Sequence, residues 1–158
     1  MADMKLSDWM ALAVDAATEI ATGALGMGNV QWRHPVDAAM PNDLCGVYIP
    51  LMTERFSVQL GVLGRPEVCT HLAKSLLGMG PDESLADESE VFDAVGEVMN
   101  LVAGSVKSRA AEHTNVTLGL PLALTGTVFP LGAAGFEHGL MRMDDSDVWL
   151  VIAGAPSS

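Results

Sequence analysis

The segment of residues 87–109 constrains the fold most, because it has the pattern of a long helix with two different faces. One set of residues recurs at steps of three and four, as the apolar face of an α-helix does: Val91, Val95, Val98, Val102 and Val106. A second set shares the opposite face: Asp93, Glu97, Asn100, Gly104 and Lys107. At about 100° and 1.5 Å per residue, Glu97 and Asn100 point the same way, roughly 4.5 Å apart along the axis. The sequence therefore predicts a half-buried helix that presents an acid beside a carboxamide.

Composition and charge narrow the class of protein. With 158 residues, 49% hydrophobic and 18% charged, the chain has the composition of a globular protein. We expect a single domain over residues 1–158, with residues 155–158 as a tail. A net charge of −12 argues against binding to nucleic acid or to an anionic membrane surface. Acidic residues interrupt the N-terminal segment, and no apolar run reaches membrane-spanning length, so we expect a cytoplasmic protein.

The cysteines and histidines do not form a recognisable metal or nucleophile motif. Cys45 and Cys69 lie in apolar surroundings and form no CxxC, so we expect buried thiols and no disulfide. The four histidines have no metal-ligand spacing: His34, His71, His113 and His138. We expect no metal site on this chain.

The remaining pattern predicts an α+β fold. A first helix is expected to start at Ser7 as N-cap and to end near Gly23, and a second is expected between Pro66 and Gly78. Strands are expected at residues 29–33, 44–51, 56–62, 116–118, 122–131, 137–143 and 148–153, with turns at 132–135 and 144–147. The alternation at 56–62 predicts a strand with one buried and one exposed face. Together these elements predict three main helices packed on an antiparallel sheet of about six strands.

The two halves of the chain resemble each other. Asp15, Glu19 and Thr22 in the first helix have the same spacing as Asp93, Glu97 and Asn100 in the third. Further on, Asn29 and Pro35 have the spacing of Asn115 and Pro121. We interpret this as an internal duplication whose first copy is degenerate, because Thr22 replaces the amide. Chance similarity between alanine-rich amphipathic helices is the alternative.

These residues resemble the signature of the CheC/CheX/FliY chemotaxis phosphatases. The match comprises Asp93, Glu97 and Asn100, then Pro121, together with the order of the elements. One intact copy of the motif is most like CheX. The resemblance implies a CheC-like two-layer fold, a homodimer, and hydrolysis of the aspartyl phosphate of a CheY-like response regulator. The interval from Asn100 to Pro121 is slightly shorter than is usual in the family.

The resemblance also implies roles for individual residues. Asn100 would orient the attacking water, and Glu97 would pair with the active-site lysine of the regulator. Asp93 and Pro121 would support the motif, and the Mg²⁺ would belong to the regulator, so that this chain binds no cofactor. An uncharged carboxamide suits a water beside an anionic phosphoryl group, because it both donates and accepts hydrogen bonds.

Three alternatives remain at this point. The chain could be a noncatalytic interaction domain, like the flagellar-switch relatives of the family. It could be a small-ligand sensor with an apolar cavity. Glu97 and Asn100 could also be an ordinary solvated helix face.

Overall fold

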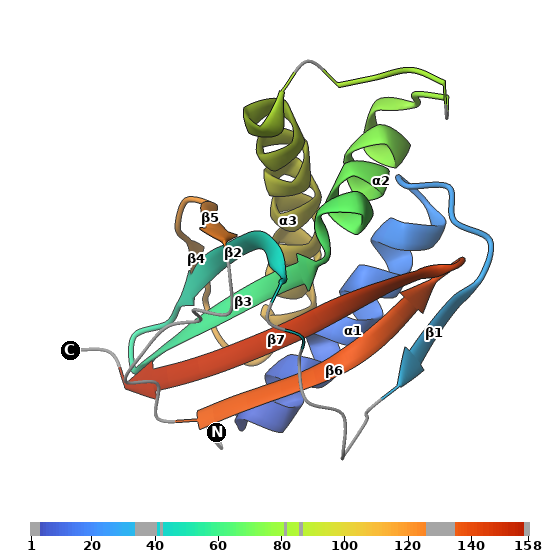
Figure 1. The fold of residues 1–158 in the computed structure, drawn as a ribbon. Helices are drawn as coiled ribbons and strands as arrows, with labels where there is room; N and C mark the ends of the chain where they lie inside the picture. The colour runs from blue at the N-terminus through green and yellow to red at the C-terminus, as the bar shows by residue number, and fades with distance from the viewer. Residues whose placement is uncertain are drawn as a thin grey trace.

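The helices lie on one face of a single antiparallel sheet (Figure 1). This computed structural model describes residues 4–33, 41, 43–80, 82–85, 87–125 and 135–156. The helices are α1 (Leu6–Thr22), α2 (Pro66–Leu77) and α3 (Glu88–Ala110). The strands are β1 (Val30–Arg33), β2 (Cys45–Met52), β3 (Phe56–Gly64), β4 (Thr117–Leu118), β5 (Leu122–Thr125), β6 (Gly135–Met143) and β7 (Ser146–Pro156). The predicted α+β class is confirmed, with a seven-stranded sheet.

The order of the strands is symmetric with respect to the two halves of the chain. The sheet runs β1-β6-β7-β3-β2-β4, and β5 pairs with β2 beside β4. The first half contributes an edge strand and the hairpin β2–β3, and the second half contributes β4 and β5 and the hairpin β6–β7. If each strand is replaced by its counterpart in the other half, the sheet has the same order read from the opposite edge. The strand order is therefore pseudo-twofold symmetric about a point between β3 and β7, as expected for two related halves.

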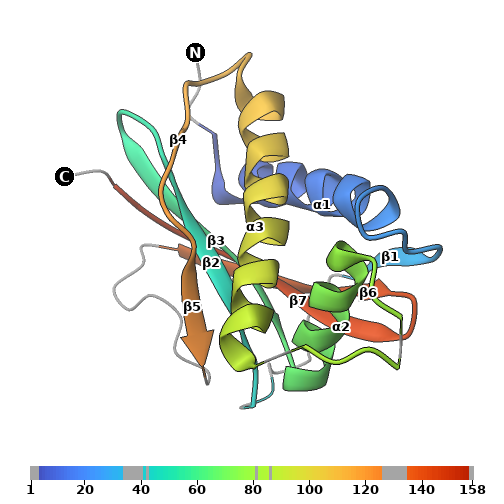
Figure 2. The ribbon, with the colours of Figure 1, turned by 90° about the horizontal axis from the view of Figure 1, so that it is seen from above.

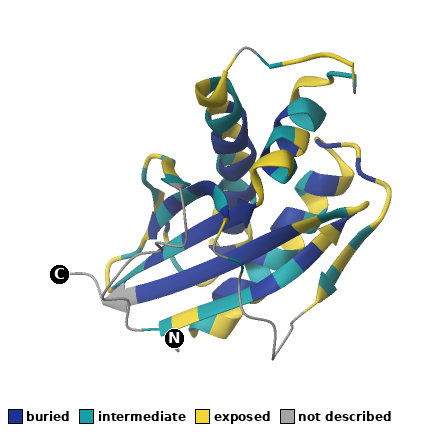
Figure 3. Cartoon of the chain, in the orientation of Figure 1, coloured by how far each residue is buried: buried dark blue, intermediate teal, exposed yellow. Residues whose placement is uncertain are grey.

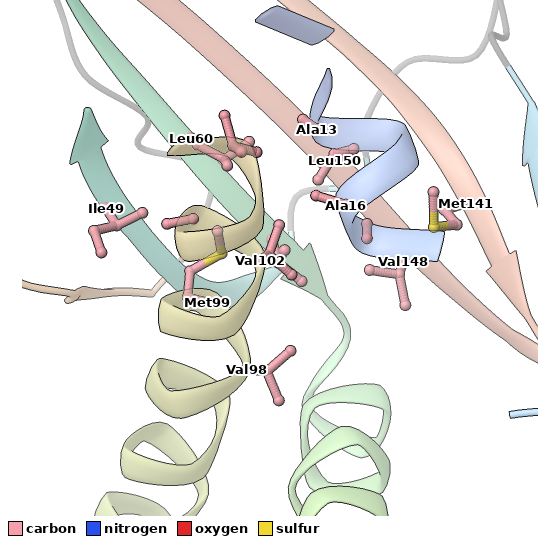
Figure 4. Packing of buried hydrophobic residues seen from close by; sticks show 14 of the residues in the cluster. Ala13, Ala16, Ile49, Leu60, Val98, Met99, Val102, Met141, Val148 and Leu150 are labelled. Atoms are coloured by element: carbon pink, nitrogen blue, oxygen red, sulfur yellow. The ribbon is translucent and has the colours of Figure 1, made fainter. Parts of the chain in front are cut away.

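The main core forms where α1 and α3 cover the sheet. Met99 and Val102 of α3 point towards the strands, where Leu60 and Ile49 meet them, and Val98 lies on the side of α3 that faces α2 (Figure 4). Met99, Leu60 and Ile49 are fully buried. Each such side chain contributes roughly 1.5–3 kcal/mol relative to an exposed one. The predicted valine stripe is thus the buried face of α3, although Val91 is only partly buried.

The other face of the sheet is apolar as well, contrary to the expectation of an exposed face. Central strands β3 and β7 are buried along most of their length (Figure 3). Leu63, Trp149 and Val151 belong to a second cluster and are 3%, 6% and 0% exposed. Alternation in residues 56–62 suggested a solvated face because Ser57, Gln59 and Gly61 are not apolar. The large apolar residues of this face lie elsewhere in β3 and on the adjacent strand β7, and they determine how the face packs.

The helix ends confirm most of the predicted signals. Pro66 begins α2, and Gly78 ends it in a left-handed conformation (φ 68°). At α1 the prediction of Ser7 as N-cap is wrong by two residues. Lys5 is the N-cap, and its backbone N–H donates to Oδ2 of Asp8 at 2.8 Å. An acid in the first turn therefore caps this helix in place of a serine hydroxyl.

The C-terminal part differs from the prediction in its last residues. Strand β7 continues to Pro156, which pairs with Phe56, so residues 155 and 156 belong to the sheet rather than to a tail. Backbone pairing with β3 extends β7 beyond its apolar residues. Such pairing cannot be predicted from the sequence pattern of β7 alone. Residues 126–131 of the predicted strand, 132–134 of the predicted turn, and 157–158 lie outside the described residues. Within the described part, no helix is long and apolar enough to cross a membrane.

Asp87 caps the N-terminus of α3. Its carboxylate accepts from the Ser89 hydroxyl at 2.8 Å and from the Glu90 backbone N–H at 3.0 Å. Hydrogen bonds from the Ser89 hydroxyl and the Glu90 backbone N–H lower the pKa of Asp87. The ionised carboxylate also lies beside the positive end of the helix dipole.

We predict that Asp87→Ala lowers the urea midpoint of unfolding at pH 7, whereas Asp87→Ser, which keeps a cap, lowers it less. Because the pKa is depressed in the folded state, the contribution of the carboxylate is present above the unfolded pKa of about 4. It is lost as the pH falls through the folded pKa. The midpoints of wild type and Asp87→Ala should therefore converge in acid. An equal difference at pH 7 and in strong acid would contradict this assignment.

Candidate functional site

The polar face of α3 is the candidate site. Glu97 and Asp93 are exposed, and Asn100 is partly exposed. Neighbouring residues Val98 and Met99 are buried, so the backbone under the pair is fixed by the core. Within the described residues, the side chains of Glu97 and Asn100 form no hydrogen bond or ion pair. They are therefore available to a partner.

Pro121 lies against the same part of α3. A methyl group added at Gly96 would stand 3.7 Å from Cβ of Pro121, which is ordinary van der Waals contact. The predicted supporting proline thus lies beside the residue that precedes Glu97. In Figure 2, α3 runs between the β4–β5 segment on one side and α1 on the other. The shortened interval before Pro121 still places it next to the motif.

Exposed leucines lie near the polar pair, and the sequence analysis did not identify them. Leu120 and Leu122, on either side of Pro121, are 80% and 48% exposed. Leu101, one turn beyond Glu97, is 41% exposed. Exposed apolar side chains beside an unpaired polar group are typical of surfaces that contact another protein. The signal in the sequence was the Leu-Pro-Leu triplet at 120–122, whose exposure depends on the sheet edge.

The degenerate first copy has a structural role in this fold. Oε1 of Glu19 accepts from the Ser105 hydroxyl at 3.0 Å, and Oε2 pairs with Arg109 at 3.1 Å. Nε of Arg109 also donates to the Ser105 hydroxyl, at 3.1 Å. Glu19 therefore ties α1 to the C-terminal part of α3 instead of standing free. Arg109, which forms this ion pair, lies in the last turn of α3.

The other two residues of the first copy do not form a second site. Asp15 and Thr22 are exposed on α1. The Thr22 hydroxyl donates to the backbone oxygen of Thr18 at 2.8 Å and to that of Glu19 at 3.3 Å. The Thr22 hydroxyl is therefore occupied by its own helix. Pro35, the counterpart of Pro121, and His34 lie outside the described residues.

No metal centre is found in the described part of the chain, where no three His, Cys, Asp or Glu side chains gather. The two thiols contact each other, with Sγ of Cys45 and Sγ of Cys69 3.5 Å apart, and they are not bonded. Burial raises the pKa of both thiols, most strongly that of Cys69. Protonated thiols are poor nucleophiles and metal ligands, so this pair is structural in character.

Comparison with known proteins identifies the family. The family model of the chemotaxis phosphatase CheX matches residues 49–140, more than half of the chain. The chain belongs to the CheX family. The matched range includes all of α3 and Pro121, and therefore the whole candidate site. A comparison with curated protein sequences finds no match.

Solved structures show the same fold at low sequence identity. The chemotaxis protein CheX from Vibrio vulnificus is 13% identical, with a TM-score of 0.77 over 97% of this chain and 100% of the other. A CheX–CheY–BeF3–Mg²⁺ complex from Borrelia burgdorferi matches at 18% identity and 0.69, covering 98% and 100%. The FliM middle domain from H. pylori matches at 10% identity and 0.60, covering 97% and 92%. These likenesses confirm the predicted CheC-like fold.

The Glu19–Arg109 ion pair provides a test of the first copy's structural role. The Arg109 and Glu19 side chains are 36% and 56% exposed, so solvent screens their attraction. We predict a coupling of about 0.2–1 kcal/mol between Glu19→Gln and Arg109→Met in a double-mutant cycle of urea unfolding. The coupling should decrease in 1 M salt. No measurable coupling at low salt would show that the pair does not hold α1 to α3.

Proposed function

We propose that this protein accelerates hydrolysis of the aspartyl phosphate on a CheY-like response regulator. The observation that carries the proposal is the pair Glu97, which is exposed, and Asn100, which is partly exposed. Neither side chain has a hydrogen bond or ion pair among the described residues, and the opposite face of their helix is largely buried. Membership of the CheX family supplies the reaction class. The Borrelia burgdorferi relative has been crystallised with CheY, BeF3 and Mg²⁺, which supports a regulator of this kind as the partner.

In the proposed reaction, α3 enters the active site of the regulator, and the Asn100 carboxamide orients a water in line with phosphorus. The water oxygen forms the new P–O bond, and the bond between phosphorus and the aspartyl oxygen breaks. The regulator recovers its carboxylate, and phosphate leaves with the oxygen of the water. No covalent intermediate forms on this chain. Acceleration comes from positioning, in which an uncharged amide is not repelled by the phosphoryl oxygens.

Glu97 is assigned to docking. Its carboxylate is exposed one turn before Asn100 and has no partner among the described residues, so a lysine of the regulator can pair with it. The pairing fixes the register of α3 against the regulator. Mg²⁺, which the reaction requires, would be held by the regulator, and we propose no cofactor for this chain. Asp93, one turn earlier, extends the acidic face along which a basic side chain could approach.

The decisive experiment follows phosphate loss from a phosphorylated CheY-like regulator with wild type, Asn100→Ala and Glu97→Ala. We predict that Asn100→Ala lowers the rate at saturating protein by about 100-fold or more and leaves the Kd for the regulator unchanged. Glu97→Ala should weaken binding by about tenfold or more as well as slow hydrolysis. Glu88→Ala is the matched control, because Glu88 is an exposed acid on the same helix but on the side opposite Glu97.

Two outcomes would contradict the mechanism. If Asn100→Ala hydrolysed the phosphorylated regulator at the wild-type rate, the Asn100 amide would have no role in the reaction. Tight binding without any acceleration by the wild type would favour a noncatalytic interaction domain. The fold likeness to the FliM middle domain from H. pylori makes that second outcome worth measuring. A small-ligand sensor would bind neither the activated nor the resting regulator.

We also propose that the protein forms a homodimer by pairing of sheet edges. Strand β1 at one edge and strands β4 and β5 at the other each pair with one neighbour in the described sheet. Unpaired backbone groups at an edge are ready to pair with a second chain. Sedimentation velocity should give twice the monomer mass, and a proline in place of Ala123 in β5 or Gln31 in β1 should identify the edge used. A monomer at all concentrations would exclude the dimer.

A further inference from the structure

An open hollow of about 380 Å³ lies beside α3, where the end of α1 meets it. Ile20 and Leu101 are its apolar residues, and Gly104, Ser105 and Ser108 form part of its surface. Glu19 and Arg109 are also part of the hollow, and because they pair with each other their charges cancel. The Ser105 hydroxyl bonds to both, so these polar groups are already paired and an apolar side chain against Ile20 and Leu101 fits better than an ion.

Gly104 is unexplained by packing inside the protein. Glycine in a helix interior weakens the helix relative to alanine, because its backbone loses more freedom on folding. At Gly96 an added methyl would stand 3.7 Å from Cβ of Pro121, in ordinary van der Waals contact. At Gly104 an added methyl would meet nothing within 4 Å among the described residues, and the backbone is ordinary helix. Alanine would therefore fit and would stabilise the isolated protein.

The hollow continues the face of the candidate site. Glu97, Leu101 and Gly104 follow at steps of four and three, so they lie along one side of α3. Gly104 lies one turn beyond Asn100 on that side. A protein segment docked over Glu97 and Asn100 would reach Gly104 after roughly 6 Å more of the helix axis. Bare backbone at Gly104 would let that segment approach closely.

We propose that a segment of the same phosphorylated regulator places a large apolar side chain in this hollow and packs over Gly104. The hollow is then a second anchor, separate from the reacting groups, that sets affinity and partner choice. This inference rests on the proposed function, because it takes the occupant to be the protein that docks on Glu97 and Asn100. A basic residue is not required at this anchor, since Arg109 already neutralises Glu19.

The test uses Gly104→Ala and Gly104→Leu in the full chain. The probe is a CheY-like regulator activated with beryllofluoride and Mg²⁺, and hydrolysis is followed with the phosphorylated form. We expect Gly104→Ala to raise the urea midpoint and to weaken binding by about tenfold, and Gly104→Leu to weaken it further. The hydrolysis rate at saturating protein should not change. A role confined to folding would not raise stability and lower affinity together.

Two further variants separate the anchor from general effects on α3. Leu101→Ala removes part of the apolar wall and should weaken binding with little change in stability, because Leu101 is 41% exposed. Glu88→Ala lies on the same helix outside the hollow, on the side opposite Glu97, and should bind like the wild type. Binding affected equally by Glu88→Ala and Gly104→Ala would contradict a localised anchor.

Failure of this inference differs from failure of the proposed function. If the Gly104→Ala variant is more stable and binds the regulator normally, the anchor is overturned. The result for Asn100→Ala can still support the proposed reaction in that case. If the Gly104→Ala variant is less stable than the wild type, the glycine is required by the fold itself, and the anchor is again overturned. A change in dimer dissociation without a change in regulator binding assigns the hollow to a second copy of this chain instead. Absence of regulator binding and hydrolysis in the wild type overturns both proposals.

Discussion

Burial of one face of α3 determines what the rest of the protein can present. Val95, Met99 and Val102 are 0–2% exposed and pack on the strands and on α1. Turning the helix by one residue, about 100°, would expose part of this stripe and move Glu97 towards the core. Burying an unpaired carboxylate costs several kcal/mol, in addition to the lost apolar burial. The core therefore fixes the direction of the acid and the amide without any contact to them.

The two halves of the fold have diverged in the role of their helices. In the first half, Glu19 has the place that Glu97 has in the second, yet its carboxylate is bound by Ser105 and Arg109. The first copy has thus become part of the support for α3. Thr22, which stands where the second half has an amide, bonds through its hydroxyl to its own helix. One half of the pseudosymmetric sheet carries the candidate site, and the other half stabilises it.

Sequence pattern predicted what depends on local periodicity and failed where distant segments meet. The faces of α3, the ends of α2 and the strand positions followed from helical spacing, proline and glycine signals. The ion pair between Glu19 and Arg109 joins residues 90 apart, and no local rule identifies it. Burial of the second sheet face escaped notice because small residues alternate in β3 while Leu63 and Trp149 pair across strands. The hollow at Gly104 exists only because α1 ends beside it.

A site on a convex helix is suited to a substrate that is itself enclosed in a protein pocket. The phosphoryl group of a response regulator lies on a folded domain, so a catalyst must insert groups rather than surround the substrate. In the proposed reaction, Asn100 would provide one such group from a backbone that the core holds rigid, although its side chain has no partner among the described residues. The amide must then be ordered on docking, which costs free energy that other contacts have to supply. Apolar contacts at Leu101 and at the leucines beside Pro121 are placed to supply it, because they lie next to the pair and are exposed before docking. Affinity and reaction are thereby assigned to different residues of one surface.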